Sequence, residues 1–359
     1  MIKKIQHKRY LIEKQKAIML KTQHIYAHKK THNINIGAIF MNKYITIPAL
    51  LIINISIPTA NADSISLSLA NDDAGFFQST LNKIYSHKDE KRDDYTQGLF
   101  IGYSHNVTES GQLSFHLAQD IYSPSGTNKR HPIAVTGDRA FSAYLHTGVE
   151  WSDVITNWFR YRFGTDFGVV GPDAGGQKVQ NKAHTIIHAE KYQAWDDQIE
   201  NRYGYTVKGM VSLTPNIELM GTNIGVYPEL SAVSGNLFQY IGYGATFAIG
   251  NDKIFNSDNG FGLLANRGLI HSSGNSGLIY KVFAGIERRE VDRNYTLQGK
   301  TLQTRSETVS LNRTVDEYRV GATVGYSPVA LTLSLNRVSP EFKTGKDYSY
   351  INGAITFIF

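Results

Sequence analysis

The chain ends with Tyr348 to Phe359, which read YSYINGAITFIF. Within this stretch Gly353, Ile355, Phe357 and Phe359 occupy every second position, up to a terminal phenylalanine. In a β-strand, residues two apart lie on the same face of the sheet. The stretch therefore predicts a strand with one largely apolar face, and this strand ends the chain.

The same alternation recurs upstream. Tyr318, Val320, Ala322 and Val324, for example, alternate with polar or small residues, which is the signature of a strand with two unlike faces. Twelve segments have this character, at about 64–70, 95–105, 112–120, 138–151, 157–170, 204–214, 216–229, 238–250, 277–291, 314–327, 329–340 and 347–359. An even strand number lets a sheet close with both chain termini at one end.

The kind of sheet follows from what surrounds these strands. No segment after residue 62 contains 18 consecutive apolar residues, which argues against a helical membrane protein. Aromatic-rich strands suit the interfacial girdles of a membrane barrel, and an alternating last strand that ends in Phe resembles the terminal signal of bacterial outer-membrane barrels. We therefore predict an all-β protein, a transmembrane antiparallel up-and-down β-barrel of about 12 strands with long outer loops.

The connections between the strands support this topology. Long connections are expected at the outer end, at 71–94, 121–137, 171–203, 230–237, 292–313 and 341–346. Short turns are expected at the inner end, near 106–111, 152–156, Pro215 and Pro328. The connection 251–276 is long yet falls at the inner end. It predicts a periplasmic plug or helix, or else an error in the strand count.

The first 62 residues differ from the rest. Met41-Asn42-Lys43, an apolar run to Ile57 and Ala60-Asn61-Ala62 have the pattern of a secretory signal peptide at 41–62. We expect residues 1–40 to be a non-native upstream extension and 63–359 to form the barrel. The leader holds ten of the 37 Lys and Arg residues and one of the 31 Asp and Glu residues. The remaining 27 and 30 give a net charge of −3, so the basic leader does not argue for nucleic-acid binding.

The sequence lacks several familiar catalytic signatures. It has no G-x-S-x-G elbow, no H-E-x-x-H and no Gly-rich phosphate loop. It also has no cysteine, which excludes disulfides and thiol catalysis. Candidate chemistry therefore rests on polar clusters in the expected outer loops.

Two clusters belong to the first expected hairpin. Asn71-Asp72-Asp73 could supply oxygen ligands to a hard cation such as Ca²⁺, or could form an ordinary Asx turn. Thr96, where the second strand begins, should lie close to Asn71 and Asp72, or be a plain strand threonine.

Two further clusters lie in later loops. Lys129 and Arg130 suit phosphate groups, although taken alone they are better explained as a solvated loop. His184 and His188 would share one face of a helix, as in a zinc pair, whereas His184 and Glu190 share a side only in an extended chain. The spacing leaves both readings open, together with that of solvated histidines.

Five stretches taken together carry a family resemblance. They are Ser66–Gly75 (SLSLANDDAG), Asp94–Ser104 (DYTQGLFIGYS), Asp138–Leu145 (DRAFSAYL), Gly168–Pro172 (GVVGP) and Gln180–His184 (QNKAH). With them, the chain resembles the lipid A 3′-O-deacylase family over residues 63–359. The resemblance implies a twelve-stranded outer-membrane barrel that removes the 3′-linked acyloxyacyl chain from the lipid A of lipopolysaccharide in a Ca²⁺-dependent reaction.

The resemblance also implies residue roles. Catalytic roles fall on His184 as the base, Glu190 and Thr96; metal binding falls on Asn71 and Asp72; substrate binding falls on Lys129, Arg130 and Gln180. A histidine with a pKa near ~6.5 can accept a proton from water at neutral pH. The site would face outward, towards lipid A in the outer leaflet, and the barrel-assembly machinery would engage the C-terminal strand.

Two other functions remain open. The barrel could be a non-enzymatic pore or adhesin whose loops only bind, or it could be a phospholipid acyl hydrolase. Loss of one acyloxyacyl unit from lipid A, with glycerophospholipids unchanged, would distinguish the deacylase from both.

Overall fold

The computed structural model describes residues 32–33, 56–57, 63–72, 94–108, 110–156, 158–251, 260–265, 267 and 277–359. The chain forms two compact units. In the smaller unit β1 (His32–Asn33) pairs antiparallel with β2 (Ser56–Ile57). The predicted upstream extension and signal peptide otherwise lie outside the described residues. The larger unit is a β-barrel.

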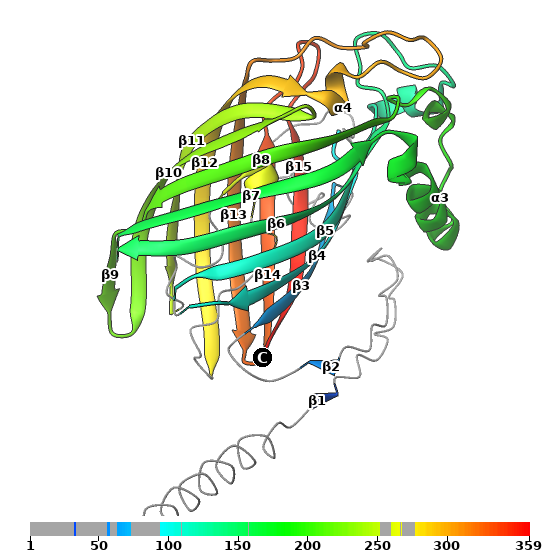
Figure 1. Cartoon of the computed structure of the whole chain (residues 1–359). Coiled ribbons are helices and arrows are strands. Elements are labelled where there is room, and N and C mark those ends of the chain that lie inside the picture. The colour runs from blue at the N-terminus through cyan, green and yellow to red at the C-terminus, as the bar shows by residue number, and fades with distance from the viewer. Residues whose placement is uncertain are drawn as a thin grey trace, which may run out of the picture. The chain divides into compact units, whose positions relative to one another are not determined.

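Twelve strands form the barrel in a closed antiparallel ring (Figure 1). In chain order they are β3 (Ser64–Asn71), β4 (Gln97–Asn106), β5 (Gln112–Tyr122), β6 (Ser142–Thr156), β7 (Phe159–Val170), β8 (Arg202–Leu213), β10 (Thr222–Gly235), β11 (Phe238–Gly250), β12 (Leu278–Asn294), β13 (Thr314–Tyr326), β14 (Val329–Val338) and β15 (Tyr348–Ile358). The last strand closes the ring by pairing with β3. The predicted strand number and up-and-down order are confirmed.

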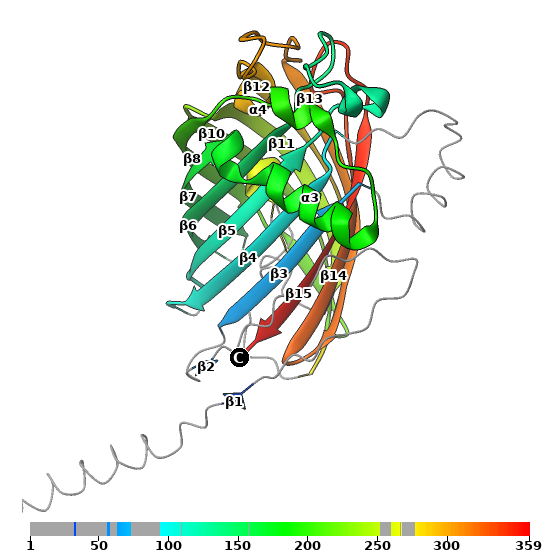
Figure 2. The same ribbon diagram turned by 90° about the vertical axis from the view of Figure 1, so that its right-hand side faces the viewer.

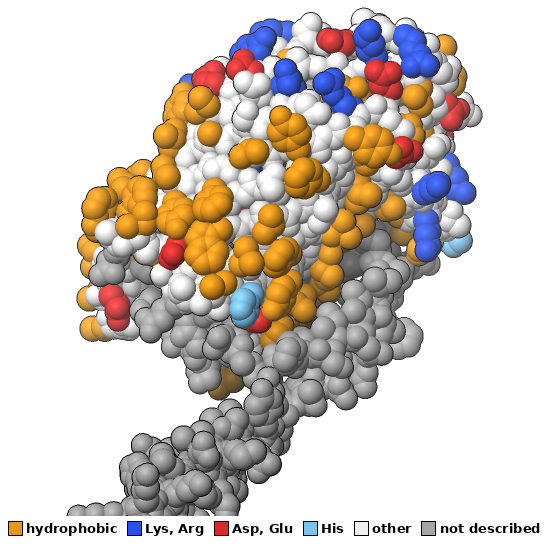
Figure 3. Space-filling view, viewed as in Figure 1, with side chains coloured by type: hydrophobic (Ala, Val, Ile, Leu, Met, Phe, Trp, Pro, Cys, Tyr) orange, Lys and Arg blue, Asp and Glu red, His pale blue; other side chains and the backbone are white. Residues whose placement is uncertain are grey.

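The wall has its apolar face outside and its polar face inside. Along β5, Ser114 and His116 are buried in the lumen, whereas Phe115 and Leu117 are about half exposed on the outer surface. Figure 3 shows the same distribution, with apolar side chains over the barrel wall and charged ones gathered towards one end. This arrangement suits a barrel whose surroundings are hydrocarbon. Among the described residues, no helix is long and apolar enough to cross a membrane.

One predicted strand is wrong. The sequence predicts a single strand over 216–229 after a turn at Pro215, but the chain instead reverses at Met220 and Gly221, both with positive φ. β9 (Asn216–Leu219) lies outside the ring and pairs with β10, which runs on to Gly235. The predicted loop 230–237 shrinks accordingly. Alternation continues on both sides of the turn, so periodicity alone does not mark it; two adjacent left-handed residues are what a tight hairpin requires.

The long connection after β11 enters the lumen. Residues 260–265, with η5 (Gly262–Leu264), and Arg267 contact strands from several sides of the ring. Gly260 N donates to Glu229 Oε2 of β10 (3.1 Å), Arg319 of β13 donates to Gly260 O (2.9 Å), and Arg267 pairs with Asp120 of β5 (2.9 Å). Contacts with opposite walls place this segment inside the barrel. The plug prediction holds for these residues.

The helices gather at the other end of the barrel, which we call the loop end. They are η1 (Gly126–Arg130), η2 (Pro172–Ala174), α3 (Gly176–Ile187), η3 (Gln193–Asp197) and α4 (Tyr295–Gln298). Figures 1 and 2 show α3 outside the ring, and it contacts β5 and β6. A buried apolar cluster packs the α3 region against the wall; it consists of Ile121, Phe141, Ala143, Val169, Ala174, Ala194 and Trp195.

Candidate active site

The strand register brings the first candidate residue to the outer face beside α3. Asn71 pairs with Gln97, Gln97 with Ile121, and Ile121 with Ala143. Directly opposed residues in a sheet share a face, and Ile121 and Ala143 belong to the cluster beneath α3. A Cβ on Gly176, the first residue of α3, would lie 2.4 Å from Ala143 Cβ. The absence of a side chain there lets the helix backbone approach the wall.

Asn71, Asp72 and Thr96 lie together, as the hairpin argument predicts. Asn71 Nδ2 donates a hydrogen bond to Thr96 O (3.0 Å). Thr96 Oγ1 contacts the hydroxyl of Ser123, which is buried just after β5. Asp72 is also buried, although it follows the last residue of β3. Carboxylate, amide and hydroxyl oxygens are thus concentrated where β3 and β4 reach the loop end.

His184 lies in the last turn of α3. The end of this helix shows whether His184 shares a side with His188, as in a continuous helix, or with Glu190, as in an extended chain. His188 adopts a left-handed conformation (φ 56°) as the C-cap, so it does not continue the helical face. The chain then turns back, and His184 Nδ1 hydrogen-bonds to the backbone carbonyl of Glu190. Because a carbonyl can only accept, Nδ1 carries a proton, and in the neutral imidazole Nε2 is then the nitrogen with the lone pair.

The Glu190 side chain has a different partner. Arg130 binds its carboxylate through Nε and Nη2 at 2.8–3.0 Å, which ties η1 to the segment after α3. The hydrogen bonds from Arg130 hold the pKa of Glu190 below its usual value. The same pairing raises the pKa of Arg130. Both side chains are exposed, so water and salt screen their attraction.

Tyr192 connects the histidine with the basic residues, and the sequence analysis missed it. Its ring meets His184 edge-on, with centroids 5.3 Å apart, and Lys129 Nζ lies 5.2 Å from its centre. On the wall side it stacks on Phe141 at 6.2 Å. Lys129 itself is only 7% exposed. The Lys129 ammonium is thus buried against the ring that also contacts His184, unlike a lysine of a fully solvated loop.

Gln180 lies on the same helix but faces the wall. It is 2% exposed, and its Oε1 accepts a hydrogen bond from Trp195 Nε1 (2.6 Å). This bond ties α3 to η3 and leaves the amide Nε2 as the group that could reach a ligand.

Two buried carboxylates fix the loops that carry these groups. Asp138 Oδ2 accepts hydrogen bonds from Ser125 N (2.8 Å) and Asn128 Nδ2 (2.8 Å), which shapes η1. Asp197 accepts from the backbone amides of Ala134 (3.0 Å) and Gln303 (2.5 Å), so it joins three loops. Asp138 belongs to one of the stretches that carry the resemblance and Asp197 to none, but in neither case does the sequence indicate which amides the carboxylate meets.

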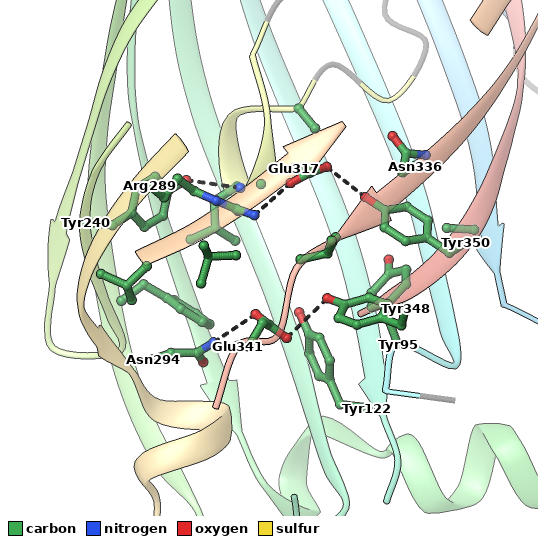
Figure 4. A pocket seen from close by; sticks show the side chains of 18 of the residues that line it. Tyr95, Tyr122, Tyr240, Arg289, Asn294, Glu317, Asn336, Glu341, Tyr348 and Tyr350 are labelled. Atoms are coloured by element: carbon green, nitrogen blue, oxygen red, sulfur yellow. Dashed lines mark hydrogen bonds and ion pairs between the residues drawn. The ribbon is translucent and has the colours of Figure 1, made fainter. Parts of the chain in front are cut away.

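A separate cavity of about 110 Å³ lies on the lumen side of the wall (Figure 4). Glu317 accepts hydrogen bonds there from Arg289 (2.8 Å) and Tyr350 (3.2 Å), and Glu341 accepts one from Tyr348 (3.1 Å). None of the candidate residues named above lines this cavity. The candidate residues thus lie outside this cavity, in two groups: Asn71, Asp72 and Thr96 at the end of β3 and β4, and His184 with its neighbours on α3 and the loops beside it.

Comparison with known proteins gives two results. The model of the family described as "Outer membrane protein LpxR" matches residues 48–359. The solved structure of LpxR from Salmonella typhimurium is 73% identical, with a TM-score of 0.80, and the match covers 82% of this chain and all of that one. A search of curated proteins found no match.

More distant barrels share little with this chain. The β domain of the Bordetella autotransporter BrkA is 9% identical with a TM-score of 0.40, and the match covers 84% of this chain and all of that one. The KdgM porin in complex with oligogalacturonate is 9% identical with a TM-score of 0.34, covering 82% and 99%. The family match, by contrast, spans the whole barrel and every candidate residue: this chain belongs to the LpxR family of outer membrane proteins.

Proposed function

We propose that this protein is a Ca²⁺-dependent ester hydrolase that removes the 3′-acyloxyacyl chain of lipid A. The loop end faces the cell exterior, so that the site meets lipid A in the outer leaflet. The observation that carries the proposal is the position of His184. It lies in the last turn of α3, with Nδ1 held by the Glu190 carbonyl and Nε2 left as a base.

His184 Nε2 takes a proton from a water molecule that attacks the carbonyl carbon of the 3′ ester. The bond between that carbon and the sugar 3′ oxygen then breaks, and the proton passes to the leaving oxygen. The products are the free acyloxyacyl acid and a 3′-hydroxyl. General base catalysis by a positioned histidine typically contributes ~10²–10⁴-fold.

The residues at the end of β3 fit a hard cation. Asn71 offers an amide oxygen and Asp72 a carboxylate, the ligand type that Ca²⁺ prefers. The Asp72 side chain is buried. Asn71 and Asp72 would hold the ion. Bound there, Ca²⁺ supplies polarisation of the ester carbonyl.

The remaining candidates complete the site. Lys129 and Arg130 bind a lipid A phosphate, Lys129 from a buried position and Arg130 by exchanging its bond with Glu190. Gln180 contributes its amide Nε2. Glu190 orients the histidine through its carbonyl, and the Thr96 hydroxyl donates to the substrate oxygens.

The plugged lumen weighs against the pore alternative. Phe261 and Leu264 are fully buried inside the barrel, and Arg267 is ion-paired to the wall there. The adhesin and phospholipid-hydrolase alternatives differ from our proposal in their products.

The test is the mass of lipid A extracted from cells that express the protein. We expect loss of one 3′-acyloxyacyl unit, with glycerophospholipids unchanged, and no loss in cells expressing His184→Ala. Unmodified lipid A beside folded, membrane-inserted protein would overturn the proposal. Release of glycerophospholipid chains would assign the site to a phospholipase instead.

A further inference from the structure

A second group of metal-type ligands lies inside the barrel, away from the candidate active site. His116 of β5, His146 of β6 and Asp166 of β7 are all buried and offer ligand atoms within 4.8 Å of one another. His116 Nε2 is 3.3 Å from Asp166 Oδ1, and His146 Nδ1 is 3.6 Å from Asp166 Oδ2. Three adjacent strands therefore converge on one point in the lumen.

A glycine makes the convergence possible. Gly148 is paired with His116 on one side and with Asp166 on the other. A Cβ at this position would lie 2.1 Å from Asp166 Oδ1 and 2.7 Å from His116 Cε1. Any side chain at 148 would thus occupy the space into which the imidazole and the carboxylate extend.

The hydrogen bonding of the cluster is incomplete. His146 is 6% exposed and Asp166 is 0% exposed. Within the described residues, neither nitrogen of His146 and neither oxygen of Asp166 makes a hydrogen bond of normal geometry. Buried polar groups of this kind almost always have a partner. Apart from the ion pairs of Asp166 with Lys208 and the two histidines, these atoms lack, in the described part of the chain, the hydrogen-bond partners that a bound cation would replace.

The surroundings orient His146 as a metal ligand. Its Nε2 lies 3.5 Å from Asp120 Oδ2, on the side away from Asp166. Asp120 is held in turn by Tyr95 (2.6 Å) and by Arg267 of the plug (2.9 Å). At 3.5 Å the contact between His146 and Asp120 is not a hydrogen bond. A small shift on metal binding would make Asp120 the acceptor behind the imidazole, the usual outer shell of a zinc-bound histidine.

We propose that His116, His146 and Asp166 bind a divalent transition metal of the zinc class. Two imidazoles and a carboxylate suit Zn²⁺ rather than Ca²⁺, which prefers oxygen ligands only. Bonds of about 2.0–2.1 Å in a tetrahedron separate the ligand atoms by about 3.3 Å. His116 Nε2 and Asp166 Oδ1 already have this separation, and the third ligand atom lies within 4.8 Å of both. A cavity of about 40 Å³ borders both histidines and leaves room for a water as the fourth ligand. The metal would link β5, β6 and β7, the wall that carries η1 and α3.

Lys208 is the competitor for this site. Its Nζ lies 3.1 Å from Asp166 Oδ1, 3.9 Å from Glu150 Oε2 and 3.3 Å from Leu263 O. When metal binds, the ammonium moves towards the latter two acceptors. Removing its charge should therefore strengthen metal binding, because a like charge a few ångströms away disfavours the cation.

The experiment measures zinc bound to the full chain, without a polyhistidine tag, in detergent. Protein equilibrated with Zn²⁺ and dialysed against metal-free buffer is assayed by mass spectrometry of the elements. We expect stoichiometric zinc in the parent, a loss of affinity of about tenfold or more in His116→Gln and His146→Gln, and about 10–100-fold loss in Asp120→Asn. Substituted Co²⁺ should give the visible absorption of a tetrahedral site.

Matched variants separate this site from others. His131→Gln, in an exposed loop, and Asp72→Ala, at the proposed Ca²⁺ ligands, should keep the zinc. Lys208→Gln should bind zinc about tenfold more tightly, which keeps the test open if a histidine variant does not fold. Heat-modifiable gel mobility verifies each barrel. Absence of zinc in the folded parent, or equal zinc in folded His116→Gln and His146→Gln, would overturn the inference and leave the cluster as a hydrated polar network.

Discussion

At the residue scale, the role of each candidate residue depends on which of its atoms contacts the other residues of the site. The family resemblance implies a catalytic role for Glu190. The atom that contacts His184, however, is the backbone carbonyl of Glu190. The carboxylate of Glu190 binds Arg130 instead. A backbone acceptor orients the imidazole without bringing a charge next to it. The ring of His184 is therefore oriented by a neutral acceptor, with Nε2 on the side away from it.

We predict that His184→Ala abolishes deacylation and leaves the barrel folded. Activity should fall by about 10²–10⁴-fold, because the variant loses the group that takes the water's proton. Substrate binding should change little, since Lys129 and Arg130 remain. Lipid A mass spectrometry measures the product, and gel mobility measures folding. His188→Ala, one residue beyond the helix, is the matched control; near-normal activity in His184→Ala would show that another group is the base.

Contacts between side chains of different loops could not be predicted from the sequence. The sequence identifies His184, Glu190 and Arg130 as polar residues of expected outer loops. It cannot show that Tyr192 lies between His184 and Lys129, because tyrosines are common in barrel strands and loops. Nor can it indicate that Asp197 binds amides from loops more than 60 residues away in either direction.

At the element scale, the site is assembled by short helices held by a few loop contacts. α3 begins after Gly175 and ends at His188, both left-handed. It is held by Gln180 on one side and, after its end, by the pair of Arg130 and Glu190. The first contact is buried and the second is exposed. The end of the helix that carries His184 is thus the part most easily released.

We predict that acid weakens the contact between η1 and the segment after α3. The bond from Arg130 lowers the pKa of Glu190 below its usual 4.5, so the docked form is favoured above that value. The stabilisation is lost as pH falls through the lowered pKa of the docked state. Hydrogen exchange of residues 188–192, compared between the parent and Glu190→Gln at each pH, measures the effect.

The variant provides the correction for the intrinsic pH dependence of exchange. At neutral pH it should exchange faster than the parent, and the difference should disappear in acid and shrink in high salt. A difference that persists unchanged below the ordinary carboxyl range would mean that the ion pair does not hold this segment.

The elements themselves were predictable to different degrees. β11 begins and ends where its alternation does, at Phe238 and Gly250, because both faces of a membrane strand are specified by their surroundings. The reversal at Met220 and Gly221 could not be predicted from the sequence. Met rarely adopts a positive φ, and the alternation of apolar and polar residues continues through this position. The spacing of His184 and His188 alone does not establish α3, because the same residues suit an extended chain as well.

At the scale of the whole molecule, the barrel is a sheet closed between its first strand, β3, and its last strand, β15. Asp63 N donates to Phe359 O (2.7 Å), and Phe359 N donates to Asp63 O (2.9 Å). These bonds continue the pairing of β15 with β3 to the last residue. Closure removes the free sheet edges, which hydrocarbon does not tolerate.

We predict that deletion of Phe359 impairs assembly more than activity. The deletion removes the last pair of closing hydrogen bonds and the residue at which the C-terminal strand should engage the barrel-assembly machinery, whereas the site at the loop end is untouched. The folded fraction in outer membranes, read from heat-modifiable mobility, should fall, and activity per folded molecule should not. A normal folded yield would contradict the assigned role of the terminal residue.

The last prediction separates the proposed metal from the fold. Asn71 and Asp72 provide few ligands, and weak sites of this kind bind Ca²⁺ at about 10⁻⁴–10⁻³ M. Chelation of Ca²⁺ should therefore stop hydrolysis. It should not unfold the barrel, because the closed hydrogen-bonded ring persists without the ion. Restored millimolar-range Ca²⁺ should restore activity in the parent, and Asp72→Ala should need more Ca²⁺ or stay inactive. Lipid A deacylation and gel mobility, measured on the same samples, give both readouts. Full activity in excess chelator would remove Ca²⁺ from the mechanism and leave the Thr96 hydroxyl and neighbouring protein donors to stabilise the oxyanion.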